Sequence, residues 1–145
     1  MPGIVVGIDG SAGSHEALEW AAREAACRPA PLTVLTAHLV AASFWTGSPI
    51  SSPADQPELE KIRQAAKDAT LRAISALTDA QPELVTVQAT SGLPAQELIS
   101  ASRDAALVVV GSRGAGGFAR LLMGSVSTQV VAHAACPVVV VPSQR

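Results

Sequence analysis

Five short apolar runs alternate along the chain with longer segments in which apolar residues recur every three or four positions. The runs are rich in β-branched residues and too short for helices, so they predict strands. They cover residues 4–8, 32–39, 84–89, 107–111 and 137–142. The longer segments predict helices, because their apolar side chains share one face of a 3.6-residue turn.

Each interval between two predicted strands holds one predicted helix. Ser11 or Ser14 can cap the first helix, which runs to about residue 26. The second covers residues 59–78, the third starts near Pro94, and the fourth spans residues 125–135. Residues 43–58 are rich in proline and serine and predict a long loop before the second helix.

This alternation of strands and helices predicts an α/β protein with an open, parallel, five-stranded sheet. Continuous apolar strands need cover on both faces, so we expect helices on both sides of the sheet. We expect one domain over residues 1–145. In the strand order 3-2-1-4-5 the first and fourth strands are neighbours. Ligands bind outside the carboxyl ends of the strands, where this order reverses.

Composition and charge exclude several classes of protein. Charged residues make up 15% of the chain and the net charge is −2, so no basic field exists to attract nucleic acid or anionic lipid. No apolar stretch reaches the ~18 residues of a membrane span, and the N-terminus lacks the basic region of a signal peptide. Cys27 and Cys136 form no CxxC motif, which favours a reducing compartment. We therefore expect a cytoplasmic protein with no nucleic-acid or membrane partner.

The most informative stretch is a glycine-rich loop between the fourth strand and the last helix. Glycine loses much conformational freedom on folding, so a glycine cluster indicates that backbone N–H groups approach a ligand closely. The glycines are Gly111, Gly114, Gly116, Gly117 and Gly124. The alternative is that they only form turns.

The helix after this loop can bind phosphate at its N-terminus. A helix N-terminus presents N–H groups without partners and about half a positive charge. Gly124 would let a phosphate reach the backbone, and the hydroxyls of Ser125 and Ser127 can donate hydrogen bonds. Arg113 could add positive charge, although it could equally be a solvated surface residue.

A second polar turn, with the sequence GIDGS, follows the first strand. Asp9 in this turn would face the loop from Gly111 to Ser125 across the crevice, where it could contact a ligand. The alternative is that its carboxylate bonds only within its own turn.

Several site motifs are absent from the sequence. The loop holds no lysine and so is not a P-loop, and neither GxGxxG nor GxSxG occurs. His15 and His38 have no acid or nucleophile at a catalytic spacing and are interpreted as structural. His133 and Cys136 share a helical spacing, but two ligands make no zinc site. We expect no catalytic residues and no metal site.

The spacing of the loop as a whole carries a family resemblance. The pattern Gly111-x2-Gly114-x9-Gly124-Ser125 resembles the G-x2-G-x9-G-[S/T] nucleotide signature of the universal stress protein family. The stretch VVGIDGS near the start and the flanks of the loop are similar to that family too. The resemblance implies an ATP-binding, Rossmann-like α/β domain, often homodimeric, that serves as a stress or dormancy regulator.

The resemblance also implies roles for residues at matching positions. Asp9, with Gly7 just before it, would lie at the ribose and base, and Leu39 would lie against adenine. The ribose and phosphate loop would include Gly111, Arg113 and Gly114, and the phosphate-binding helix start would be Gly124, Ser125 and Ser127.

We therefore predict an ATP-binding universal stress protein, with or without Mg²⁺, that acts as a nucleotide-dependent regulator or binding module. The alternatives are a slow ATP hydrolase or phosphotransferase, and a structural dimer whose glycine loop is empty. No positioned general base other than Asp9 is evident, which disfavours turnover. Residues 137–142 form an apolar edge strand, and we predict a homodimer through it.

Overall fold

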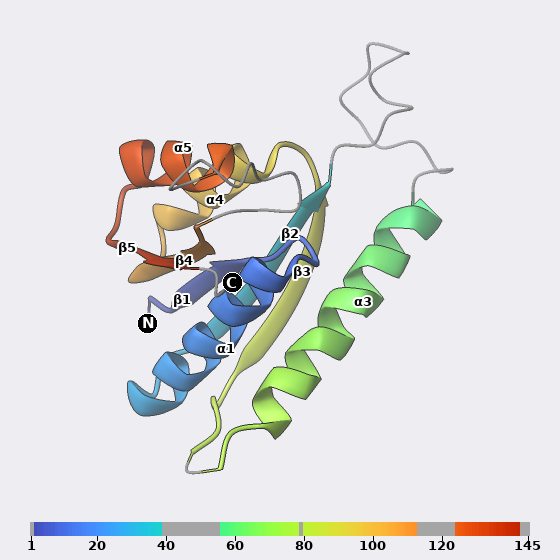
Figure 1. The fold of residues 1–145 in the computed structure, drawn as a ribbon, viewed down its shortest axis with the longest axis vertical. Helices are drawn as coiled ribbons and strands as arrows, with labels where there is room; N and C mark the ends of the chain where they lie inside the picture. The colour runs from blue at the N-terminus through green and yellow to red at the C-terminus, as the bar shows by residue number, and fades with distance from the viewer. Residues whose placement is uncertain (1, 39–55, 79, 113–123, 143–145) are drawn as a thin grey trace.

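One parallel sheet of five strands organises the molecule (Figure 1). The computed structural model describes residues 2–38, 56–78, 80–112 and 124–142. The strands are β1 (Ile4–Gly7), β2 (Leu32–His38), β3 (Val85–Ser91), β4 (Leu107–Gly111) and β5 (Val138–Val141). Their order is β3-β2-β1-β4-β5, and every neighbouring pair is parallel. The predicted fold class and strand order are confirmed.

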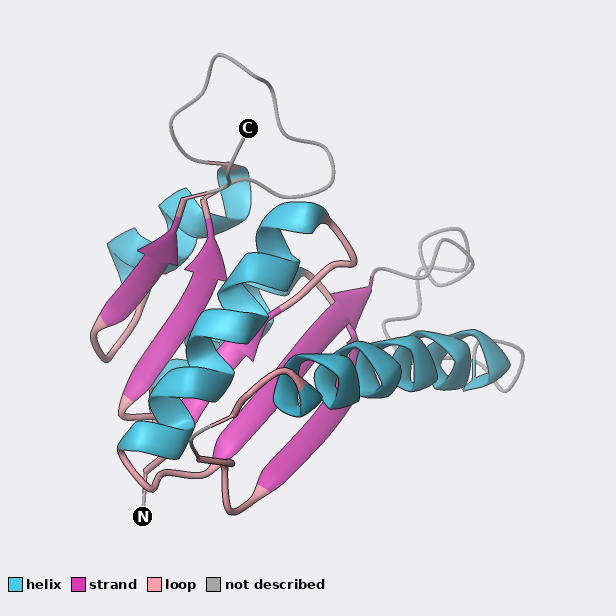
Figure 2. Ribbon diagram, turned by 60° about the horizontal axis from the view of Figure 1, so that its bottom comes forward, coloured by secondary structure: helices cyan, strands magenta, loops and turns pink. Residues whose placement is uncertain are grey.

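The helices cover both faces of the sheet. Helices α1 (Ala12–Cys27) and α3 (Gln56–Ser75) lie on one face, the one turned to the viewer in Figure 2. Helices α4 (Pro94–Ser102) and α5 (Ser125–His133) lie together on the other face (Figure 1). A sheet covered in this way needs apolar side chains on both sides, which explains why the strands read as unbroken apolar runs.

Two apolar cores fill the spaces between the sheet and its helices. Successive side chains of a strand point to opposite faces, so β1, β2, β4 and β5 each supply both cores, whereas β3 supplies only the core under α1 and α3. The core under α1 and α3 includes Ile4, Val6, Leu18, Leu32, Val34 and Val109. The core under α4 and α5 includes Val5, Leu35, Leu98, Val108, Val110 and Val130.

Ser11, the first of the two candidate caps, begins α1. Its hydroxyl accepts a hydrogen bond from Ser14 N at 3.2 Å, and its backbone is extended, as a helix cap requires. Ser14 lies inside the first turn instead. The capping bond fixes the direction in which the chain leaves β1, and so places the turn that contains Asp9.

The predicted bounds of several other elements were wrong by a few residues. Helix α3 begins at Gln56, so the last residues of the predicted 43–58 loop are helical, with Glu58 favourably placed in the first turn. Strand β3 extends to Ser91 because β2 pairs with it along its whole length. Helix α5 ends at His133, since Ala134 already has an extended ψ of 149°. Residues 39 and 43–55 lie outside the described ranges.

Candidate functional site

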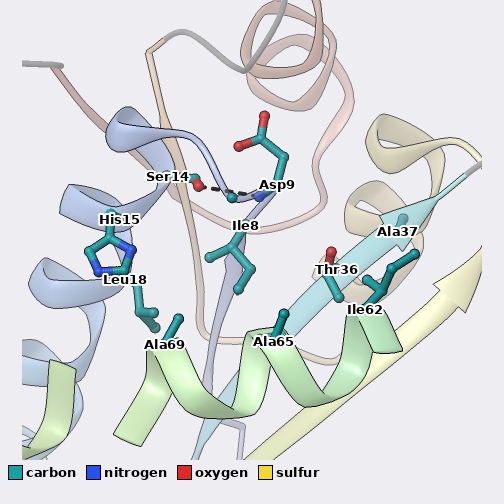
Figure 3. A pocket seen from close by; sticks show the side chains of 12 residues that line it. Ile8, Asp9, Ser14, His15, Leu18, Thr36, Ala37, Ile62, Ala65 and Ala69 are labelled. Carbon is teal, nitrogen blue, oxygen red and sulfur yellow. Dashed lines mark hydrogen bonds between the residues drawn. The ribbon is translucent and has the colours of Figure 1, made fainter. Parts of the chain in front are cut away.

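A cleft lies between α1 and α3, over the carboxyl ends of β1 and β2 (Figure 3). Its volume is about 290 Å³, close to the lower limit of ~300 Å³ for small-molecule pockets. The walls are mainly apolar. The lining residues are Ile8, Asp9, Gly10, Ser14, His15, Leu18, Thr36, Ala37, Ile62, Ala65, Ala66 and Ala69.

The cleft has one apolar wall made of small residues. Ala65, Ala66 and Ala69 of α3 face the cleft, and Ile62 adds a larger side chain one turn earlier. Ala66 is buried, whereas Ala65 is exposed. Because alanine reaches only as far as Cβ, this side of α3 leaves open the space that leucine would fill. The wall can contact a flat apolar group.

Asp9 stands on the rim of the cleft and is held by its own turn. Its carboxylate accepts hydrogen bonds from Ser11 N at 2.9 Å and from Ser11 Oγ at 2.5 Å. Its backbone N–H donates to Ser14 Oγ at 3.2 Å. Figure 3 shows the carboxylate directed away from Ile8 and the α3 wall. The turn bonds predicted as the alternative are therefore present, and a ligand contact of Asp9 stays a prediction.

Two of the predicted site glycines have packing reasons of their own. A Cβ on Gly111 would lie 2.8 Å from Gly13 O, in the first turn of α1. A Cβ on Gly7 would lie 2.7 Å from Leu98 Cδ1 of α4. The glycine at the end of β4 thus lets α1 pack directly against that strand. Through this contact the rim of the cleft adjoins the end of β4.

Helix α5 begins beside the end of β4. Gly124 N donates to Ser112 O at 2.5 Å, which fixes the helix start beside the end of β4. Gly124 has φ −77° and ψ 174°, an extended conformation open to any residue. Within the described residues, no side-chain hydrogen bond caps this helix. Its first N–H groups have no partner within the helix, and Ser125 beside them is exposed.

Ser127 lies inside the protein and bonds to the backbone. It is 2% exposed, and its Oγ lies 3.1 Å from both Ser112 O and Gly124 O. These contacts give it a structural role at the helix start, and its predicted phosphate contact stays a prediction. Leu39, Arg113 and Gly114, also predicted site residues, lie outside the described ranges.

The structure brings to the cleft residues that the sequence did not single out. His15, interpreted as structural, lines it from α1 (Figure 3), and Thr36 lines it from β2. The alanines of α3 come from a helix with no recognisable motif. The sequence offered one indication of the place of Thr36. It lies two residues after Val34 and four after Leu32 in β2, so it shares their face of the sheet, the one covered by α1 and α3.

The described part of the chain offers no metal site and no reactive thiol pair. Its His, Cys, Asp and Glu side chains form no group of three or more that could hold an ion. Cys27 and Cys136 are both free, and burial raises the pKa of the Cys136 thiol. Among the described helices none is long and apolar enough to cross a membrane.

The fold and the cleft define a class of protein: an open α/β sheet whose candidate ligand site lies over the carboxyl ends of β1 and β2, beside the point between β1 and β4 where the strand order reverses. Within that class, the chain belongs to the Universal stress protein family, whose sequence model matches residues 2–142. A universal stress protein of Mycolicibacterium smegmatis is 37% identical over 139 residues, which cover 96% of this chain and 47% of the relative. The resemblance predicted from the sequence is confirmed at the level of the family.

Solved structures agree with this assignment. The universal stress protein UspA from Lactobacillus plantarum aligns with a TM-score of 0.72 at 25% identity, covering 97% of each chain. A universal stress protein solved in complex with cAMP aligns with a TM-score of 0.67 at 26% identity, covering 99% of this chain and 98% of that one. The chain spans about half the length of the curated relatives it matches.

Proposed function

We propose that this protein binds an adenine nucleotide, ATP in the first instance, and acts as a nucleotide-dependent regulatory module. The observation that carries the proposal is the cleft at the carboxyl ends of β1 and β2, which adjoins the uncapped start of α5 through Gly111 and Ser112. Nucleotides bind in open parallel sheets at the carboxyl ends of the strands where the strand order reverses, and the cleft together with the start of α5 flanks that point between β1 and β4. The relative solved with cAMP supports the same ligand class.

The cleft is large enough for only one part of a nucleotide, the base. A volume of about 290 Å³ and apolar walls suit the base. The triphosphate, which is charged and bulky, belongs outside the cleft. The start of α5 offers it backbone N–H groups, the positive end of the helix dipole and the exposed hydroxyl of Ser125. Arg113 would add positive charge, as the sequence predicts.

The chemistry of the described residues favours binding over turnover. Asp9 is the carboxylate that lines the cleft, and Ser11 already holds it in the turn. A hydrolase needs a base positioned on the attacking water. Any Mg²⁺ would be held mainly by the phosphates of ATP, a common arrangement for this ion. Slow hydrolysis would appear in the binding experiments as phosphate release.

Replacing Gly124 with alanine is expected to weaken ATP binding about tenfold or more while the fold persists. The backbone angles of Gly124 suit alanine, so stability should change little. The added methyl group would stand where the phosphate approaches the N–H groups of α5. Thr128→Ala, one turn further along α5, is the matched control and should bind as wild type. Calorimetric titration of both variants measures the difference, and equal affinities would remove Gly124 from the site.

Replacing Asp9 with asparagine separates its two roles. Asparagine keeps an oxygen that can accept from Ser11 N, so the melting temperature should hold within a few degrees. A charge-assisted hydrogen bond to a ribose hydroxyl is worth about 1.5–3 kcal/mol, so its loss should weaken ATP binding by roughly tenfold or more. An unchanged affinity would show that Asp9 does not contact the nucleotide.

We also propose that the protein forms a homodimer through β5. This strand is an edge of the sheet, and its four residues are all valine. An edge presents unpaired backbone groups to another strand, and a second copy related by a two-fold axis would pair antiparallel with it. A cytoplasmic location and a role in stress adaptation complete the proposal.

A further inference from the structure

Thr36 interrupts the apolar pattern of β2 at its carboxyl end. Leu32, Val34 and Thr36 alternate along the strand and share the face covered by α1 and α3. Leu32 and Val34 are fully buried in the core of that face. Thr36 is 6% exposed and pairs in register with Ala89 of β3. A hydroxyl therefore occupies a position where the strand elsewhere places an aliphatic side chain.

The hydroxyl of Thr36 has no hydrogen bond within the described part of the chain. Several other buried hydroxyls find acceptors: Thr70 Oγ1 donates to Ala66 O at 2.7 Å, and Ser102 Oγ to Ile99 O at 2.5 Å, whereas the buried Thr90 Oγ1 of β3 has none among the described residues. Ser14 and Ser127 bond to backbone oxygens too. The Thr36 oxygen differs from the fully buried Thr90 oxygen, because Thr36 keeps some exposure and lines the cleft.

The cleft is where a ligand can reach the hydroxyl of Thr36. Thr36 lines it, and Figure 3 shows the hydroxyl oxygen directed toward the side on which Asp9 lies. Beside it are Ile8 and the alanines of α3, which offer no hydrogen bond from their side chains. Asp9, Ser14 and His15 also line the cleft, from the β1 turn and α1, whereas Thr36 supplies the hydroxyl on the β2 side. A mainly apolar pocket with a few placed polar groups selects ligands that carry matching polar atoms.

We propose that Thr36 is a specificity-determining residue, whose hydroxyl hydrogen-bonds a ring nitrogen or exocyclic amine of the base held in this cleft. The inference rests on the nucleotide-binding function proposed above and adds the residue that reads the base. A hydroxyl can donate to a ring nitrogen or accept from an amine. A ligand without such an atom would leave the hydroxyl dehydrated and unpaired, which lowers its affinity.

The test is the pair Thr36→Val and Thr36→Ser. Valine keeps the shape and favours strands, so the protein should unfold at the same temperature as wild type or higher, because no internal hydrogen bond is lost. Its ATP affinity should fall about tenfold, the loss expected for one buried hydrogen bond. Serine keeps the hydroxyl and should retain most of the affinity. Calorimetric titration and thermal unfolding are measured on all three proteins.

Thr70→Val is the matched control. Thr70 does not itself line the cleft, and its hydroxyl donates to the backbone oxygen of Ala66, so the variant should lose stability and keep its ATP affinity. If Thr36→Val binds ATP as wild type does, or loses stability as Thr70→Val does, the proposal for Thr36 is overturned and the nucleotide function stands. If the wild-type protein binds no adenine nucleotide, the proposed nucleotide-binding function is wrong, and the proposed role of Thr36 is wrong as well.

Discussion

Gly111→Ala should destabilise the fold by about 2 kcal/mol or more, within the range measured for overpacked cores. The new Cβ would lie 2.8 Å from Gly13 O and 3.0 Å from Gly13 C, both backbone atoms of the first turn of α1. A backbone segment cannot rotate away as a side chain can. The helix must therefore shift from β4, and the apolar contacts of that helix with the sheet would loosen with it. Urea unfolding measures the change in free energy.

Gly7→Ala is the matched comparison for this experiment. Its Cβ would meet only the side chain of Leu98, at 2.7 Å from Cδ1, and a leucine can change rotamer. The expected loss in the free energy of unfolding is therefore smaller than for Gly111→Ala. Equal costs at the two positions, or a stability of Gly111→Ala within about 0.5 kcal/mol of wild type, would show that α1 can move freely at this contact. The comparison also explains why Gly124, rather than Gly111, is the useful probe of ligand binding.

Val140→Pro should convert a dimeric protein into a monomer with its fold retained. Ser112 N donates to Val141 O and Val108 N to Pro137 O, so residues 137 and 141 point their backbone groups toward β4. Backbone groups alternate along a strand, and those of Val140 therefore point outward from the sheet. Proline would remove one outward N–H while sparing the bonds to β4, as edge strands tolerate. Light scattering at micromolar concentrations measures the mass.

Val140→Thr serves as the control for the edge. Threonine is β-branched and keeps its N–H, so this variant should remain dimeric. A wild-type protein that runs as a monomer under the same conditions would contradict the dimer, and so would a dimeric Val140→Pro variant.

The sequence predicted the sheet well because its signals were local. The valines of β4 and β5 and the cap at Ser11 reflect periodicity and turn chemistry that a few neighbouring residues determine. The start of α3 was harder, since proline and serine near it resemble a loop and the helix gains its stability from packing on β2 and β3.

The site was predictable only in part, for a related reason. Gly111 ends β4 and Asp9 stands in a recognisable turn, but the reasons the structure gives for them are a packing contact with Gly13 and a bond to Ser11. Thr36, His15 and Ala65 reach the cleft from three different elements. Their convergence is a product of the tertiary fold, and no spacing along the chain records it.

The first turn of α1 separates the cleft from β4, and this has a mechanical consequence. On one side Ser14 lines the cleft, and on the other the backbone of Gly13 packs against Gly111. Because the backbone of Gly13 is already in close contact with Gly111, a ligand that enters the cleft cannot push α1 closer to β4. The opposite wall is α3, whose alanines leave space on the cleft side. Any adjustment to a ligand should therefore occur at α3, while α1 stays in place against β4.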